Sequence, residues 1–208
     1  MHNLTLEQKQ QIAERIRQIE TQTLGELVTV IARRSDDYFY IPSLWAALLA
    51  LLTPLATQFF WLQLTINQLV LLQLGCFTVL VLLFRWPPLT LLLVPKTIQH
   101  TRCQRRAQEL FFMEGLHLTQ GRTAVMLFVS EAEKYVEILA DAGIDAEVAD
   151  EQWDALVDNF VSHVKAGQVA QGFLETIDGC GQLLIKHFPV TDSRVNPNEL
   201  SDHLIEID

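Results

Sequence analysis

The feature that most constrains the fold is a long uncharged run, because no Asp, Glu, Lys or Arg occurs from Tyr38 to Phe84. A helix needs about 20 apolar residues to cross the roughly 30 Å hydrocarbon core of a bilayer. Residues 41–61 supply one such segment, and residues 66–84 supply a second. We therefore predict a transmembrane hairpin of two helices. The alternative is a pair of buried core helices, which a 208-residue chain could hardly cover.

The ends of the two predicted spans carry the residues expected at a membrane interface. Aromatic residues cluster near both ends of each span, and the connection "LQLTINQ" is a short polar turn. Pro54 lies within the first span and predicts a kink there. Pro87 and Pro88 end the second span, so we expect residues 85–96 to lie along the interface. A third crossing by this segment is the alternative.

Basic residues flank the hairpin and are absent from its turn. The positive-inside bias therefore predicts two spans with both termini in the cytoplasm. We also expect these residues to form a basic collar facing anionic lipid, each contributing about 1 kcal/mol near the surface. The collar consists of Arg33, Arg34, Lys96, Arg102, Arg105 and Arg106.

The segments on either side of the hairpin predict one α/β domain. Thr5 and Gln8 form a capping box at the start of a helix. The apolar, β-branched run 26–32 predicts a strand buried on both faces, paired in parallel with a strand at 124–129 through a right-handed crossover. A polar turn then leads to an antiparallel strand at 135–139.

Two apolar stripes at helical spacing follow the predicted strands, so the C-terminal half is expected to be helical. The fold class is thus α/β, a helix–sheet–helix sandwich with a small mixed sheet, interrupted by the transmembrane hairpin. The tail is expected either to dock on the domain or to stay loose. The predicted boundaries are 1–37 and 96–190 for the split domain, 38–95 for the hairpin and interfacial segment, and 191–208 for the tail.

Several segments together resemble the TPM domain family. They are "IETQTLGELVTVIA", "GRTAVMLFVS", "YVEILADAGI", "EQWDALVDNFVSHVKAG" and "LLIKHFP". More narrowly, the chain is similar to the bacterial membrane-protein branch, in which a two-span hairpin interrupts the domain. The resemblance implies a sandwich that can present an acidic cleft at strand ends. Members are described as binding divalent cations, phosphatase activity has been attributed to some, and others are linked to the upkeep of membrane protein complexes.

Acidic residues follow the two strands predicted to be parallel, and ligands gather at the carboxyl ends of such strands. Their oxygens could hold Ca²⁺ or Mg²⁺, although solvated turn acids are the alternative. Ser35 and Ser130 are candidate nucleophiles by position alone. Asp141 and Asp145 follow the antiparallel strand and are expected at the opposite edge. The candidate metal ligands are Asp36, Asp37, Glu131 and Glu133.

Composition excludes several classes of function. Residues 123–208 carry four basic residues against 17 acidic ones, a balance that repels nucleic acid. The chain has no dinucleotide-binding, P-loop or serine-hydrolase motif. Its three cysteines are far apart, which argues against a disulfide framework or a zinc site.

The sequence thus predicts a non-enzymatic TPM-like module that is anchored in the bacterial inner membrane. It would contact lipid and bind or tune a membrane-protein partner at the cytoplasmic face. The alternative is a divalent-metal-dependent phosphatase acting close to the membrane surface. A transporter or channel is poorly supported, because the two spans contain no charged residue.

Overall fold

The structure is a computed structural model, which describes residues 4–191, 196 and 198–207. The chain divides into two compact units, and the first of them is discontinuous in sequence. The first unit comprises residues 1–35 and 102–208, and the second comprises residues 36–101.

The first unit is built on a four-stranded mixed sheet with the strand order β3-β2-β1-β4. β1 pairs in parallel with β2, which places Val28 opposite Met126 and confirms the predicted pairing. β2 pairs with β3 in the predicted antiparallel sense. The strands are β1 (Glu26–Ala32), β2 (Ala124–Ser130), β3 (Tyr135–Ala140) and β4 (Ile205–Ile207).

The two central strands are buried on both faces, and alternate residues enter two separate cores. Leu27 and Val125 belong to one core, while Val28 and Met126 belong to the other. This follows from the period of two along a strand. A continuous apolar run is what a strand covered on both sides requires.

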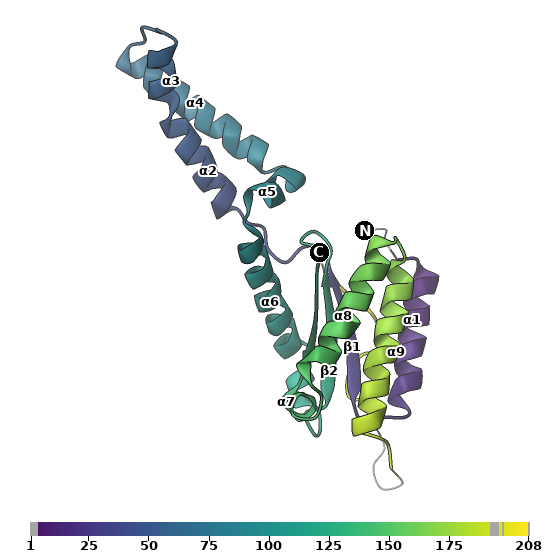
Figure 1. Ribbon diagram of the computed structural model, residues 1–208. Coiled ribbons are helices and arrows are strands. Elements are labelled where there is room, and N and C mark those ends of the chain that lie inside the picture. Colours follow the sequence, from purple (N-terminus) through teal and green to yellow (C-terminus); the bar gives the residue numbers. More distant parts are fainter. Residues whose placement is uncertain (1–3, 192–195, 197, 208) are drawn as a thin grey trace. The chain divides into compact units, whose positions relative to one another are not determined.

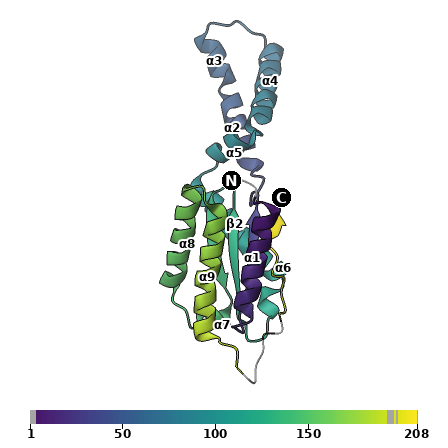
Figure 2. The ribbon, with the colours of Figure 1, turned by 90° about the vertical axis from the view of Figure 1, so that its right-hand side faces the viewer.

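Helices cover both faces of the sheet, as predicted. On one face, α1, α9 and α8 lie side by side (Figure 2). On the other face, Cys103, Ala107 and Leu110 of α6 pack against β1 and β2 (Figure 1). The predicted capping box of Thr5 and Gln8 begins α1. The bounds are α1 (Leu6–Glu20), α6 (Lys96–Met113), η1 (Leu116–Leu118), α7 (Ala142–Asp145), α8 (Asp150–Lys165) and α9 (Val169–His187).

The C-terminal segment adds the fourth strand. β4 runs parallel to β1, with Val30 opposite Ile205 and Ala32 opposite Ile207. The sequence left open whether the tail docks, and its described part does so. Three residues in a polar tail give no periodic signal, so this pairing could not be read from sequence.

The second unit consists of short and long apolar helices. The first predicted span is interrupted at Leu52, next to the predicted kink at Pro54, so that it forms two helices. A second capping box, Thr65 with Gln68, begins the long helix α4 directly after the polar turn. The bounds are α2 (Tyr40–Leu51), α3 (Thr53–Phe59), α4 (Ile66–Phe84) and α5 (Pro87–Leu93).

Two helical segments, Tyr40–Phe59 and Ile66–Phe84, are long and apolar enough to cross a membrane. Large apolar side chains of α4 are exposed, among them Leu71 at 68% and Leu82 at 66%. Core helices of a soluble protein would be mostly buried, so this exposure argues against that alternative. α5 has seven residues and a length of about 10 Å, which is too short for a third span.

Candidate functional site at the carboxyl ends of the parallel strands

The loops that follow β1 and β2 remain paired beyond the strands. The backbone N–H of Glu131 donates to Ala32 O at 2.9 Å, and that of Ala132 donates to Arg33 O at 3.0 Å. The parallel register of the strands brings these loops to the same edge of the sheet. The chain leaves the first unit from this edge, after Ser35.

Two hydroxyls and one carboxylate join the loops, and we call them the Ser35–Ser130–Glu133 network. The Ser35 hydroxyl donates to Ser130 Oγ at 2.9 Å, and the Ser130 hydroxyl donates to Glu133 Oε2 at 2.5 Å. Glu133 Oε1 accepts the backbone N–H of Ser35 at 3.1 Å. Ser130 and Glu133 are buried. Both carboxylate oxygens of Glu133 are thus bound to the two loops.

A thiol of α6 lies next to this network. Burial raises the pKa of the Cys103 thiol to about 11, although a hydrogen bond with Ser35 acts against the rise and the charge of Glu133 adds to it. The thiolate is the reactive form of cysteine, so a raised pKa keeps Cys103 unreactive at neutral pH. It contributes to the core instead.

Two side chains of β3 complete the polar surroundings. Burial is the main cause that raises the pKa of the Tyr135 hydroxyl, and the charge of Glu137 adds to it. Burial also raises the pKa of Glu137, against a hydrogen bond with Tyr135 that lowers it. The residues that join the two loops are Ser35, Ser130 and Glu133, and their hydrogen bonds can hold the loops in place.

The four predicted metal ligands are divided between the two units. Glu131 and Glu133 belong to the first unit, whereas Asp36 and Asp37 belong to the second. Asp36 Oδ1 accepts the backbone N–H of Tyr38 at 3.2 Å. Within the described part of the chain, no three His, Cys, Asp or Glu side chains form a group that could hold a metal ion. A shared Ca²⁺ or Mg²⁺ site therefore stays a prediction.

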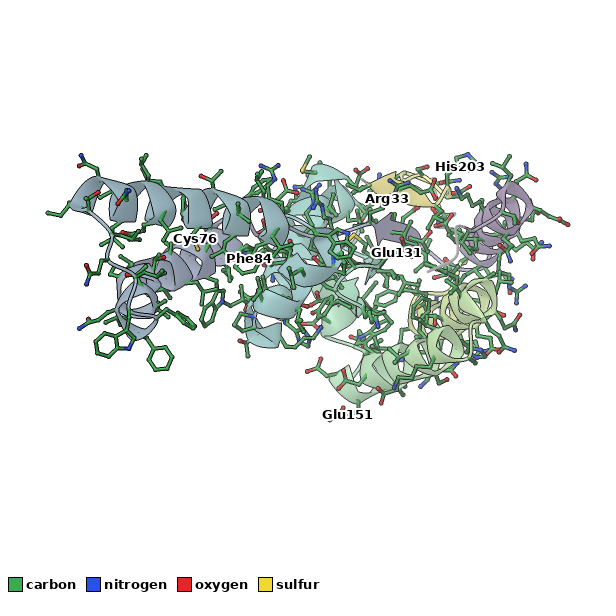
Figure 3. All side chains as sticks on the ribbon, turned by 90° about the horizontal axis from the view of Figure 1, so that it is seen from above. Arg33, Cys76, Phe84, Glu131, Glu151 and His203 are labelled. Carbon is green, nitrogen blue, oxygen red and sulfur yellow. The ribbon has the colours of Figure 1, made fainter. Side chains whose placement is uncertain are left out.

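A polar cavity of about 360 Å³ lies in the first unit. Arg33 and Glu131 both line it, and both are labelled in Figure 3. Lys9 and Glu206, which also line it, form an ion pair at 2.7 Å. Of the two loop carboxylates, Glu131 is thus the one that faces open space.

The residues of the predicted basic collar are mostly exposed. α6 carries four of them, with Lys96 bound to Gln99 Oε1 at 3.0 Å and Arg106 paired with Glu109 at 3.6 Å. Arg33 and Arg34 follow β1 directly. Their contact with lipid stays a prediction.

Acidic residues also lie at the opposite, amino end of the parallel strands, and the sequence analysis identifies only some of them. Asp141 lies at this edge, as expected, where it caps α7 and pairs with Arg122 at 2.7 Å. Glu20 and Glu26, by contrast, are buried there at 4% and 2% exposure. A signal was present, because each is a charged residue next to the apolar runs of α1 and β1.

Comparison with known proteins agrees with this fold. The family profile of the TPM domain, which carries the name TPM phosphatase, matches residues 88–183. The solution NMR structure of the BA42 protein from the psychrophilic bacterium Bizionia argentinensis is similar, with a TM-score of 0.62 and 18% sequence identity. The similarity covers 99% of this chain and 96% of BA42. No curated protein matches the chain in sequence.

At this level of identity the similarity to BA42 concerns the fold alone. Residues 88–183 thus match the profile of the TPM domain, and the sheet also contains β1 and β4, which lie outside the matched residues. The narrower resemblance, to a membrane branch of the family with an inserted hairpin, stays a prediction.

Proposed function

We propose that this chain is a membrane-anchored, TPM-like module that binds or tunes a membrane-protein partner at the cytoplasmic face, without a reaction of its own. The observation that carries the proposal is the bonding of Glu133. Both of its oxygens bind the loops after β1 and β2, and the two nearby hydroxyls belong to the same network. Groups that are needed to hold the loops are poorly placed to serve as nucleophile or metal ligand.

The proposed orientation rests on strand pairing and charge. β1 and β2 flank the second unit in sequence and lie in one sheet, so both must be on the same side of any membrane. Two spans return the chain to the side that it left, whereas one or three would not. The basic residues on both flanks favour the cytoplasmic side.

The partner can be tested by purification from intact membranes after chemical crosslinking. We expect one membrane protein to be recovered together with the wild-type chain, in an amount comparable to that of the chain itself. A matched variant, Phe112→Ser with Leu118→Ser, changes two exposed apolar side chains of the first unit, which are 60% and 74% exposed. Exposed apolar side chains of this kind commonly contact partners. The proposal would be contradicted if the wild-type chain and the double variant recovered the same proteins in equal amounts, and these were only abundant, unrelated ones.

The second candidate is a divalent-metal-dependent phosphatase, which the name of the matching family and the open cavity at Glu131 favour. The test is turnover of a generic phosphomonoester by the purified chain with Mg²⁺ or Ca²⁺. Asp36→Ala with Asp37→Ala is one control variant, and Glu131→Gln is the other. If the wild-type chain turns over the substrate and these variants do not, the phosphatase function replaces our proposal. We expect the wild-type chain to show no turnover above that of the variants.

A further inference from the structure

Three buried carboxyl side chains lie close together near the amino end of β1, at the end of the strands opposite the Ser35–Ser130–Glu133 network. Glu20 ends α1, Glu26 begins β1, and Asp202 belongs to the segment that leads into β4. They are 4%, 2% and 7% exposed. We call these three residues the buried acid cluster, and we call residues 198–207 the C-terminal segment. The segment runs along β1 and covers the cluster.

The C-terminal segment is held by the β4 pairing, by polar contacts and by apolar side chains that pack against the two cores. The backbone N–H of Glu199 donates to Glu26 Oε1 at 3.1 Å, and Arg17 Nε donates to Asp202 Oδ2 at 3.1 Å. Further along, the backbone N–H of Arg33 donates to Ile207 O at 2.9 Å, and the half-exposed Glu206 pairs with Lys9. The segment contacts the buried acid cluster at more than one point, because Glu26 also accepts a hydrogen bond from the backbone of Leu200, and Asp202 lies within hydrogen-bonding distance of Glu20.

The cluster is incompletely satisfied. Glu20 Oε1 accepts the backbone N–H of Leu27 at 2.9 Å. Among the described residues, Glu20 Oε2 and Glu26 Oε2 have no hydrogen-bond partner. Burying an ionised carboxylate without a partner is costly, whereas the protonated form is neutral and can itself donate a hydrogen bond.

Charged side chains of α1 and of the C-terminal segment lie around the cluster. α1 contributes Arg17, which pairs with Asp202, and the C-terminal segment contributes Glu199 beside Glu26. Acids thus outnumber the single cation among these groups. Burial is the largest cause that raises the pKa of Glu20, to about 9, with the charges of Glu26 and Asp202 adding to it against the Leu27 hydrogen bond. Burial raises the pKa of Glu26 as well.

We propose that the C-terminal segment is a proton-controlled strap: protons bound to the buried acid cluster keep it on β1, and their loss releases it. Release would expose the edge of β1 at residues 30–32, where β4 pairs in the docked state. An open strand edge can pair with another extended segment. The strap therefore regulates access to the sheet edge.

The direction of the pH dependence follows from the raised pKa values. The docked state keeps protons that the released state loses above the ordinary carboxyl pKa near 4.5. Docking is therefore tightest near that pH and weakens steadily as the pH rises towards 9.

Hydrogen exchange of the full chain in lipid nanodiscs tests the proposal, with rates expressed as protection factors at each pH. We expect protection in residues 199–207 to fall about tenfold or more between pH 6 and pH 8. β2, which lies in the centre of the sheet, serves as the internal reference and should keep its protection. Loss of protection in β2 at the same pH would mean global unfolding and would overturn the proposal.

Two neutral variants of the cluster sharpen the test. Glu20→Gln keeps an acceptor for Leu27 N–H and cannot ionise, so protection of the segment should change less than about twofold over the same pH range. Glu26→Gln should also reduce the pH dependence, and it serves in place of the first variant if that chain does not fold by circular dichroism. Glu206→Gln is the matched control, because it removes an exposed ion pair and should lower protection equally at each pH. A wild-type profile that is flat, or a neutral cluster variant with the wild-type slope, overturns the proposal.

Discussion

The buried carboxyl groups at the two ends of the parallel strands differ in how completely they are hydrogen-bonded. At the carboxyl end of the parallel strands, both oxygens of Glu133 are bound by Ser35 and Ser130. At the amino end, Glu20 and Glu26 each bury an oxygen that has no partner among the described residues. Burial alone therefore does not define the role of an acid. A fully bonded carboxylate fixes loops in place, whereas an incompletely bonded one makes its surroundings depend on pH.

The largest expected effect is at the bonded edge. Glu133→Ala leaves the Ser130 hydroxyl and the Ser35 N–H without their shared acceptor in a buried place. We expect the free energy of unfolding of the first unit to fall by about 3 kcal/mol, as measured by urea titration in nanodiscs. Glu133→Gln, which keeps one acceptor oxygen, should lose less. Equal losses for both variants would mean that the hydrogen bonds are not the cause.

The next effect concerns the buried acid cluster and has the opposite sign. At pH 8 the wild-type chain must keep Glu20 protonated, because burial raises its pKa to about 9. Glu20→Gln removes that cost, so we expect it to stabilise the first unit by about 2 kcal/mol at pH 8. The gain should nearly disappear near pH 4, below the ordinary carboxyl pKa of 4.5, where the unfolded chain also binds the proton. Urea titrations at the two pH values give this comparison, and a gain that does not depend on pH would contradict it.

A smaller effect is expected for the outer hydroxyl of the network. Ser35→Ala removes the donor to Ser130 Oγ, but Ser130 still donates to Glu133 and the backbone N–H of residue 35 remains bonded. We expect a loss of about 1 kcal/mol by the same titration. A loss as large as that of Glu133→Ala would show that the hydroxyl contributes more than one hydrogen bond.

The smallest effect is expected for the other acid of the same turn. Glu131 lines the open cavity rather than the network. Glu131→Gln should therefore change the free energy of unfolding by no more than about 0.5 kcal/mol. A larger change would place Glu131 among the residues that hold the loops, and the distinction between the two turn acids would be lost.

Most of the fold could be predicted from the sequence because its signals are long. The seven-residue runs of β1 and β2 are mostly apolar, and the predicted insertion of two spans allows them to pair in parallel. The short polar turn before β3 indicates antiparallel pairing. β4 could not be predicted, since it pairs residues that are far apart in the chain through only three positions.

The site was harder to predict for a physical reason. Sequence places Ser35, Ser130 and Glu133 at one edge, but it cannot tell whether a turn acid points outward to solvent or inward to a hydroxyl. That depends on the positions of side chains within two adjoining loops. Glu20 was missed for a related reason, because its burial depends on a C-terminal segment whose docking the sequence left open.

The two central strands of the sheet are separated in sequence by an insertion that we propose crosses the membrane twice. Protease accessibility of intact spheroplasts tests this most directly, with one epitope tag before residue 4, another after residue 208, and a third in the turn at residues 62–65. We expect both terminal tags to be protected and the tag in the turn to be cleaved. Cleavage of one terminal tag but not the other would place β1 and β2 on opposite sides of the membrane and would contradict the account.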